Sequence, residues 1–306
     1  MTEPTTIAVP EHVEHRISTP DGRTLAVAEW GDPEGLPLLA IHGTPGGRIS
    51  WFGPDPGIDA RHGLRRFTLD RPGYGESSRR PGRRVVDLVT DVTTIFDALG
   101  IEQFAVTGGS GGGPHALACA ALLPERVLRC LAIVSVAPFG DGGLDEDGWL
   151  AGMTQGNVDE FRAAREGEPA IRAICEAERA TMFARLDAGR TDVLGDSYDL
   201  AEADKAQMAR HAAVMAANTR ACLAHGVDGW VDDDIAFVQP WGFDVTSIRV
   251  PVRLSYGRAD TLVPGAHGDW LAAHIPGAVA DVTEHGHMGD DAEVERQKAW
   301  LAGAWA

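Results

Sequence analysis

The chain has 306 residues, 44% of them apolar, which suffices for one large core with an inserted subdomain or for two small domains. Its formal net charge of −18 argues against nucleic acid and against an anionic membrane as partners, because both would repel it. The polar start (residues 1–13) does not resemble a secretory signal, and no apolar run reaches the roughly 18–20 residues of a membrane-spanning helix. Four cysteines without CxxC or CxxH spacing predict reduced thiols in a cytoplasmic protein, rather than a disulfide or a zinc site.

Strands and helices alternate through the first part of the chain. A Pro-Asp-Gly turn signal between residues 15–19 and 24–30 predicts a hairpin. Apolar residues on one helical face predict a helix over 84–99, and a second helix is expected to end at Leu123. Short apolar runs predict further strands at 36–41, 66–69, 104–107 and 129–136. Because such alternation is typical of parallel sheets covered on both faces, it predicts an α/β core.

The alternation stops between residues 141 and 244. This stretch is acidic and rich in alanine, and it predicts helices with no convincing strand. Its acidic runs, 145–147 and 232–234, are expected to face water, with binding of an ammonium group as the alternative. Alternation then resumes, with strands predicted at 250–256 and 278–282 and helices at 267–275 and 292–305. The predicted domains are a core formed by 1–140 and 245–306 and a helical insertion at 141–244.

The strand predicted at 104–107 leads into the segment Gly108-Gly109-Ser110-Gly111-Gly112, which matches the G-x-S-x-G pattern. Small neighbours permit the strained turn that such a serine needs, and the following helix directs free N–H groups at the reacting centre. The strand–turn–helix context favours Ser110 as a nucleophile over a flexible turn or a phosphate-binding loop. No dinucleotide or P-loop fingerprint is present, and we expect neither a cofactor nor a metal.

A nucleophilic serine needs a base and an acid, in the chain order Ser, Asp or Glu, His. Asp260 and His287 follow the last two predicted strands, and so lie on loops at the edge where α/β sheets place their sites. His287 would accept the serine proton, and Asp260 would hold the correct tautomer. Asp141 is a rival acid and His285 a rival base. Gly286 favours His287, because glycine leaves room for the ring to reach the serine.

Two earlier loops carry further motifs. In HGTPGG, the backbone N–H of Thr44 is the candidate oxyanion donor, because Pro45 has no N–H. The second donor is expected from Gly111, the residue after the nucleophile. His42 is expected to brace this loop. In DRPGYGES, Asp70 is expected to stabilise a rigid turn by accepting backbone N–H groups.

Together, the motifs HGTPGG, DRPGYGES, GGSGG, GRAD and GHM occur in the order typical of the α/β-hydrolase superfamily, which the chain resembles over roughly two-thirds of its length. The resemblance implies an eight-stranded, mostly parallel sheet with helices on both faces and an inserted helical lid. It also implies Ser110, Asp260 and His287 as a catalytic triad, with Thr44 and Gly111 as oxyanion donors.

The resemblance further implies a small-molecule substrate, with hydrolysis of a carboxylic ester or lactone through an acyl-serine intermediate. Haloalkane dehalogenases and epoxide hydrolases carry an aspartate where this chain has Ser110, which disfavours both. Proline iminopeptidases are similar, but their motifs usually read HGGPG and GGSWG, from which Thr44 and Gly111 depart. An aminopeptidase, a C–C bond hydrolase, a cyclising enzyme and a non-catalytic ligand receptor remain alternatives.

Overall fold

The computed structural model describes residues 8–190, 193 and 198–303. Residues 1–7 of the polar start, 191–192 and 194–197 of the insertion, and 304–306 at the end of the predicted closing helix lie outside the described residues. None of the helices in the described part of the chain is long and apolar enough to cross a membrane.

Eight strands form one sheet in the order β1-β2-β4-β3-β5-β6-β7-β8. β2 pairs antiparallel with β1 and with β4, whereas every other neighbouring pair is parallel, as predicted for an α/β core. The strands are β1 (Val13–Ser18), β2 (Thr24–Gly31), β3 (Leu36–Ile41), β4 (Leu64–Leu69), β5 (Phe104–Gly109), β6 (Val127–Ile133), β7 (Val252–Gly257) and β8 (Val279–Thr283).

The predicted strand 129–136 is displaced in the structure. β6 begins at Val127 and ends at Ile133, and Val134 follows with a φ of 42°. A positive φ interrupts extended backbone, so the chain leaves the sheet at this residue. β5, in contrast, continues two residues beyond its predicted end and leads directly to Ser110.

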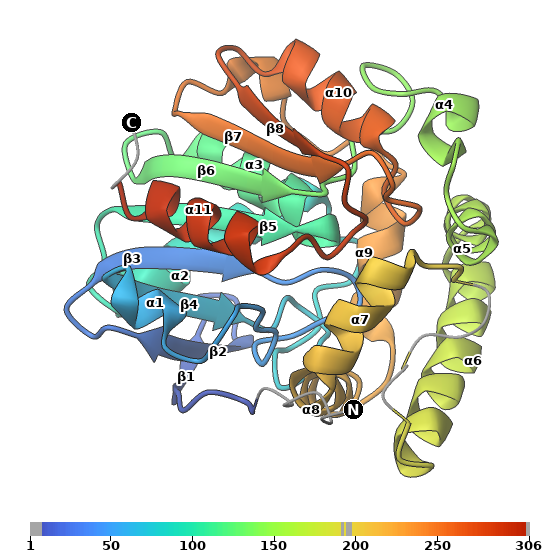
Figure 1. Cartoon of the computed structure of the whole chain (residues 1–306), viewed down its shortest axis with the longest axis horizontal. Helices are drawn as coiled ribbons and strands as arrows, with labels where there is room; N and C mark the ends of the chain where they lie inside the picture. The colour runs from blue at the N-terminus through green and yellow to red at the C-terminus, as the bar shows by residue number, and fades with distance from the viewer. Residues whose placement is uncertain (1–7, 191–192, 194–197, 304–306) are drawn as a thin grey trace.

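Helices cover both faces of the sheet, α1 and α11 on one and α2, α3 and α10 on the other (Figure 1). Neighbouring residues of β3 divide between these faces. Leu38 packs in a cluster with Trp300 of α11, and Leu39 packs in the main cluster with Phe96 of α2. The helical elements of the core are α1 (Ile58–Arg61), η1 (Val85–Asp87), α2 (Leu88–Ala98), η2 (Ser110–Gly112), α3 (Gly113–Leu122), η3 (Val245–Ser247), α10 (Gly265–His274) and α11 (Asp291–Leu301).

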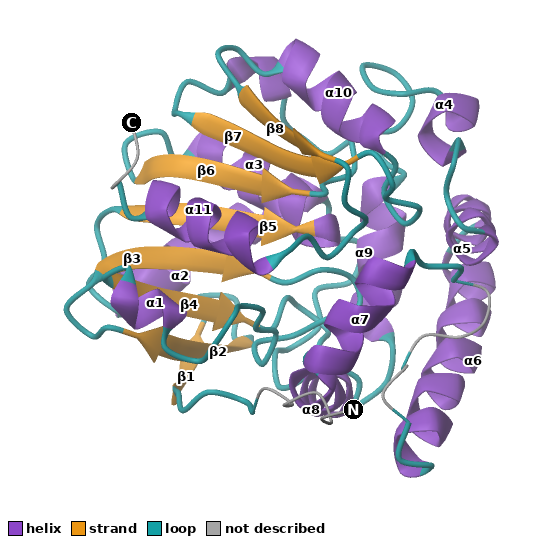
Figure 2. Cartoon of the chain, viewed as in Figure 1, coloured by secondary structure: helices purple, strands orange, loops and turns teal. Residues whose placement is uncertain are grey.

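Among the described residues, six α-helices lie between β6 and β7 and are here called the insertion. They are α4 (Glu146–Leu150), α5 (Gln155–Glu166), α6 (Glu168–Asp187), α7 (Glu202–Arg210), α8 (Ala212–Cys222) and α9 (Asp228–Phe237). Figure 2 shows them beyond the arrowheads of the parallel strands, at the edge of the sheet where β5 delivers Ser110. The insertion therefore covers the edge at which the sequence predicts a site.

Candidate active site

Ser110 lies in a sharp turn between β5 and α3. Its φ is 52°, in the left-handed region that is strained for a residue with a side chain and costs about 1–3 kcal/mol. The glycines on either side permit this turn. A Cβ at Gly108 would lie 2.2 Å from the carbonyl oxygen of Gly112, and one at Gly112 would lie 2.3 Å from that of Ile41. Side chains at these positions would therefore force the turn open.

His287 and Asp260 lie in direct contact on the loops that follow β8 and β7. His287 Nδ1 is 2.8 Å from Asp260 Oδ2, while Asp260 Oδ1 accepts the backbone N–H groups of Leu262 and Val263 at 2.8 and 3.0 Å. With Nδ1–H donated to this carboxylate, Nε2 of His287 is the free acceptor. Burial lowers the pKa of His287, but the charges of Asp260 and Asp204 outweigh it, so that the pKa is raised above its usual 6.5.

The two rivals lie elsewhere. Asp141 is exposed on the loop after β6. The ring of His285 is 3.4 Å from Glu293 and 3.6 Å from Asp290, both of them near the start of α11. The structure therefore brings Asp260 to His287 and leaves Asp141 and His285 outside this contact.

The same three residues, His285, Asp290 and Glu293, form the one group within the described ranges whose side chains could together hold a metal ion. Ordinary contacts explain their proximity. Asp290 caps α11 by accepting the N–H of Glu293 at 2.7 Å, and Glu293 accepts hydrogen bonds from Ser255 and Gln297. We therefore assign this group no ligand.

The HGTPGG loop lies beside the serine, since a Cβ at Gly43 would be 3.9 Å from Ser110 Oγ. The side chain of Thr44 is hydrogen-bonded to two other residues. Its Oγ1 donates to Asp233 Oδ2 at 2.9 Å and accepts from Arg71 Nη2 at 2.9 Å. A Cβ at Gly111 would lie 2.3 Å from this Oγ1. Thr44 and Gly111 are the two residues that depart from the HGGPG and GGSWG motifs. These departures are therefore coupled, because the threonine hydroxyl occupies the space that a side chain at residue 111 would need.

His42 and Asp70 have the supporting roles expected of them. His42 Nδ1 lies 2.7 Å from the carbonyl of Gly43, and its Nε2 accepts the backbone N–H of Arg71 at 3.2 Å. Burial, with a contribution from the Arg71 charge, holds the pKa of His42 well below 6.5, so the ring is neutral. The Asp70 carboxylate accepts the N–H groups of Arg48 and Glu76 at 2.7 and 3.0 Å.

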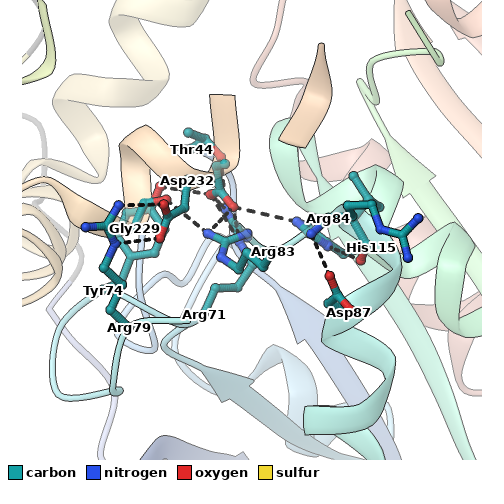
Figure 3. A network of polar contacts seen from close by, with 12 residues as sticks. Thr44, Arg71, Tyr74, Arg79, Arg83, Arg84, Asp87, His115, Gly229 and Asp232 are labelled. Carbon is teal, nitrogen blue, oxygen red and sulfur yellow. Dashed lines mark hydrogen bonds and ion pairs between the residues drawn. The ribbon is translucent and has the colours of Figure 1, made fainter. Parts of the chain in front are cut away.

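The acidic run 232–234 on α9 is buried, and the expectation that it faces water was wrong. Asp233, with no exposed surface, contacts Arg71, Arg83 and the Tyr74 hydroxyl, and Figure 3 labels these three partners within one network of polar contacts. Burial opposes ionisation of Asp233, but Arg71 and Arg83 outweigh it and hold its pKa well below 3.8. Asp232 contacts Arg79 at 2.8 and 2.9 Å. Arginines of the core therefore neutralise carboxylates of the insertion, and this electrostatic pairing joins the two parts.

A cavity of about 380 Å³ lies between the insertion and the core. From the core it is lined by Thr44, Ser110, Gly111 and His287, and from the insertion by residues that include Phe161, Met182, Met208 and Phe237. Four of the five predicted site residues therefore face one cavity, with Asp260 behind the histidine. Apolar side chains of the insertion therefore form part of the cavity wall.

Two carboxyl groups of the insertion, Glu160 and Asp234, also line the cavity. They are hydrogen-bonded to each other, which requires that they share a proton, and burial raises the pKa of both. Trp230 Nε1 and the Tyr198 hydroxyl donate to Glu160 at 2.5 and 3.2 Å. No sequence pattern marks Glu160, because its partners lie far along the chain.

A sequence model described as the alpha/beta hydrolase fold matches residues 37–289, and the chain belongs to this family. Proline iminopeptidase of Neisseria meningitidis is 28% identical over 86% of both chains. Epoxide hydrolase B of Mycobacterium tuberculosis is 35% identical over 42% of this chain and 37% of that enzyme. The chain spans less than half the length of the first curated relatives that it matches.

Solved structures extend the fold comparison to nearly the whole chain. The enol-lactonase of Burkholderia xenovorans LB400 matches with a TM-score of 0.63 and 20% identity, over 95% of this chain and 98% of that one. At this identity the likeness establishes the shared fold and nothing about the substrate.

Proposed function

We propose that the protein is a serine hydrolase that cleaves a carboxylic ester or lactone of a small to medium organic substrate through an acyl intermediate on Ser110. One observation carries the proposal: His287 Nδ1 lies 2.8 Å from Asp260 Oδ2, and the histidine lines the same cavity as Ser110, whose φ is 52°. These three residues are of the types that acyl transfer needs as nucleophile, base and orienting acid, which supports the proposal.

In the proposed reaction, Ser110 Oγ attacks the acyl carbon while its proton passes to His287 Nε2. The charge that develops on the carbonyl oxygen is stabilised by the backbone N–H groups of Thr44 and Gly111. The imidazolium, stabilised by Asp260, then gives its proton to the leaving alcohol. Water, activated by His287, hydrolyses the acyl-serine and restores the enzyme. Residues 141–244 serve as a lid that shapes the acyl site and limits access of bulk water.

Replacement of Ser110 by alanine tests this function. Turnover of p-nitrophenyl butyrate should fall to the uncatalysed background, because no other group in the described part of the cavity takes the place of Oγ. Ser247→Ala is the matched control, since Ser247 is exposed and lies outside the cavity. Full turnover by Ser110→Ala, with both variants folded, would refute the proposal.

A second candidate is an aminopeptidase acting through the same serine. The Glu160–Asp234 pair favours it, because a protonated amine placed beside the pair could take the position of the shared proton and leave both groups ionised. The proline iminopeptidase relative points the same way. The departures at Thr44 and Gly111 weigh against it.

The two candidate functions predict different substrate preferences. L-proline p-nitroanilide and p-nitrophenyl butyrate should be compared by kcat/KM on the same preparation. A preference for the ester supports the first function, and a preference for the free amine supports the second. N-acetylation of the proline substrate should abolish its turnover only if the amine is recognised.

A further inference from the structure

We propose that Asp204, on α7 of the insertion, is a positioning residue that fixes the main chain of the histidine loop and thereby the aim of His287. The histidine loop is defined here as Glu284–Met288. The inference rests on the proposed function, because it assigns Asp204 its effect through the general base.

The contacts of Asp204 are to backbone N–H groups on both sides of the base. Its Oδ2 accepts the N–H of His287 at 2.9 Å, and its Oδ1 accepts the N–H of Met288 at 2.9 Å. The residue is 2% exposed, so water does not compete for these hydrogen bonds. Hydrogen bonds to a charged acceptor are stronger than those between neutral groups, which makes the contact well suited to holding a loop.

Gly286 is the counterpart of this contact. The sequence suggested that this glycine makes room for the imidazole ring, but a Cβ at Gly286 would lie 2.1 Å from Asp204 Oδ2. The space beside the glycine is therefore filled by the carboxylate. Glycine permits the carboxylate to reach two consecutive N–H groups, so the GHM motif and Asp204 form one structural unit although they come from different parts of the chain.

His287 therefore contacts two carboxylates from different elements. Asp260, from the loop after β7, contacts the ring, and Asp204, from α7, contacts the main chain. Among other titratable groups nearby, His285 turns toward Glu293 and Asp290, while the exposed Lys205 pairs with Glu202. The charges of Asp260 and Asp204 both favour the imidazolium. Asp204 therefore affects the aim of the base and also its basicity.

Asp204→Asn is the direct test, because asparagine keeps the shape but replaces one acceptor oxygen with an N–H₂ group. We expect kcat on p-nitrophenyl butyrate to fall about 10–100-fold, the effect of a small misplacement of a reacting group, while KM changes little. The acid limb of the kcat/KM profile should move to lower pH, because removing a negative charge lowers the pKa of His287. Amide hydrogen exchange at His287 and Met288 should become faster.

Glu202→Gln is the matched control, since it removes the same charge from the same turn of α7 at a side chain that is 89% exposed. It should leave the rate, the pH profile and the amide exchange unchanged. If Asp204→Asn matches wild type in all three measurements, or changes them no more than Glu202→Gln does, the proposal is wrong.

Gly286→Ala provides an independent variant if Asp204→Asn does not fold. Its Cβ displaces the carboxylate from the other side, so it should reproduce the loss of rate and of amide protection; wild-type behaviour would overturn the proposal. Amide exchange and NMR titration of His287 do not depend on turnover. If Ser110→Ala retains activity, the proposed function fails, while these two measurements still decide whether Asp204 holds the histidine loop.

Discussion

The insertion holds two loops of the candidate site, and it holds them by different chemistry. The HGTPGG loop is tied through Thr44 and Arg71 to Asp233, a buried carboxylate with two guanidinium partners. The histidine loop is tied to Asp204 through backbone N–H groups. In the first contact the carboxylate is neutralised by cations. In the second its charge acts on His287, the proposed general base, so we expect the first contact to affect stability and the second to affect the reaction.

The largest expected effect concerns the contact between Asp260 and His287. Asp260→Asn keeps the shape of the side chain but removes the charge that orients and stabilises the imidazolium, and kcat on p-nitrophenyl butyrate should fall about 10⁴-fold. The melting temperature should change little by comparison. Asp141→Asn, at the exposed rival acid, is the control and should behave as wild type. A loss of less than tenfold in Asp260→Asn would exclude this residue from the proposed triad.

The next effect concerns stability. Asp233→Ala leaves the buried guanidinium groups of Arg71 and Arg83 without their shared carboxylate, and the free energy of unfolding should fall by about 3–5 kcal/mol. Urea denaturation followed by circular dichroism measures the change. Asp147→Ala, in the exposed acidic run, should lie within about 0.5 kcal/mol of wild type. Equal stability of the two variants would show that the contacts of Asp233 do not stabilise the protein.

The smallest effect separates the side chain of Thr44 from its main chain. Thr44→Val removes the hydroxyl that contacts Asp233 and Arg71 but keeps the backbone N–H proposed as an oxyanion donor. Stability should fall by about 1–3 kcal/mol, because a buried hydrogen-bonded group loses its partner. The value of kcat should fall less than about tenfold, whereas loss of a donor costs about 10²–10³. A fall in the latter range would assign the donor role to the hydroxyl.

The core elements could be predicted because their signals are local. Apolar runs such as 36–41 mark buried strands, and the order of Ser110, Asp260 and His287 follows from strand and loop positions that the chain itself displays. The structure confirmed the mostly parallel sheet and placed these residues at one edge. Strand ends were less accurate: β5 continues two residues past its predicted end, and β6 stops before Val134, where the positive φ is unusual for a β-branched residue.

The contacts that the insertion makes with the core could not be predicted in the same way, because the residues involved lie far apart in the sequence. Asp233 lies 162 residues from Arg71, and no local pattern announces that pairing. The run 232–234 looked like an exposed charge cluster because the cations that neutralise it are elsewhere in the sequence. One signal was available: the segment 71–84 holds five arginines, an excess of positive charge that matches an acidic helix.

The four cysteines are divided between the core and the insertion, so each part of the molecule can be probed separately. Cys119 of α3 and Cys130 of β6 belong to the core, whereas Cys175 of α6 and Cys222 of α8 belong to the insertion, and all four are free and buried. Burial raises the pKa of each thiol, that of Cys119 to about 12. A thiol reagent therefore modifies a cysteine only when its surroundings open. Labelling rates of single-cysteine variants would thus compare how fast the insertion opens with how fast the core opens.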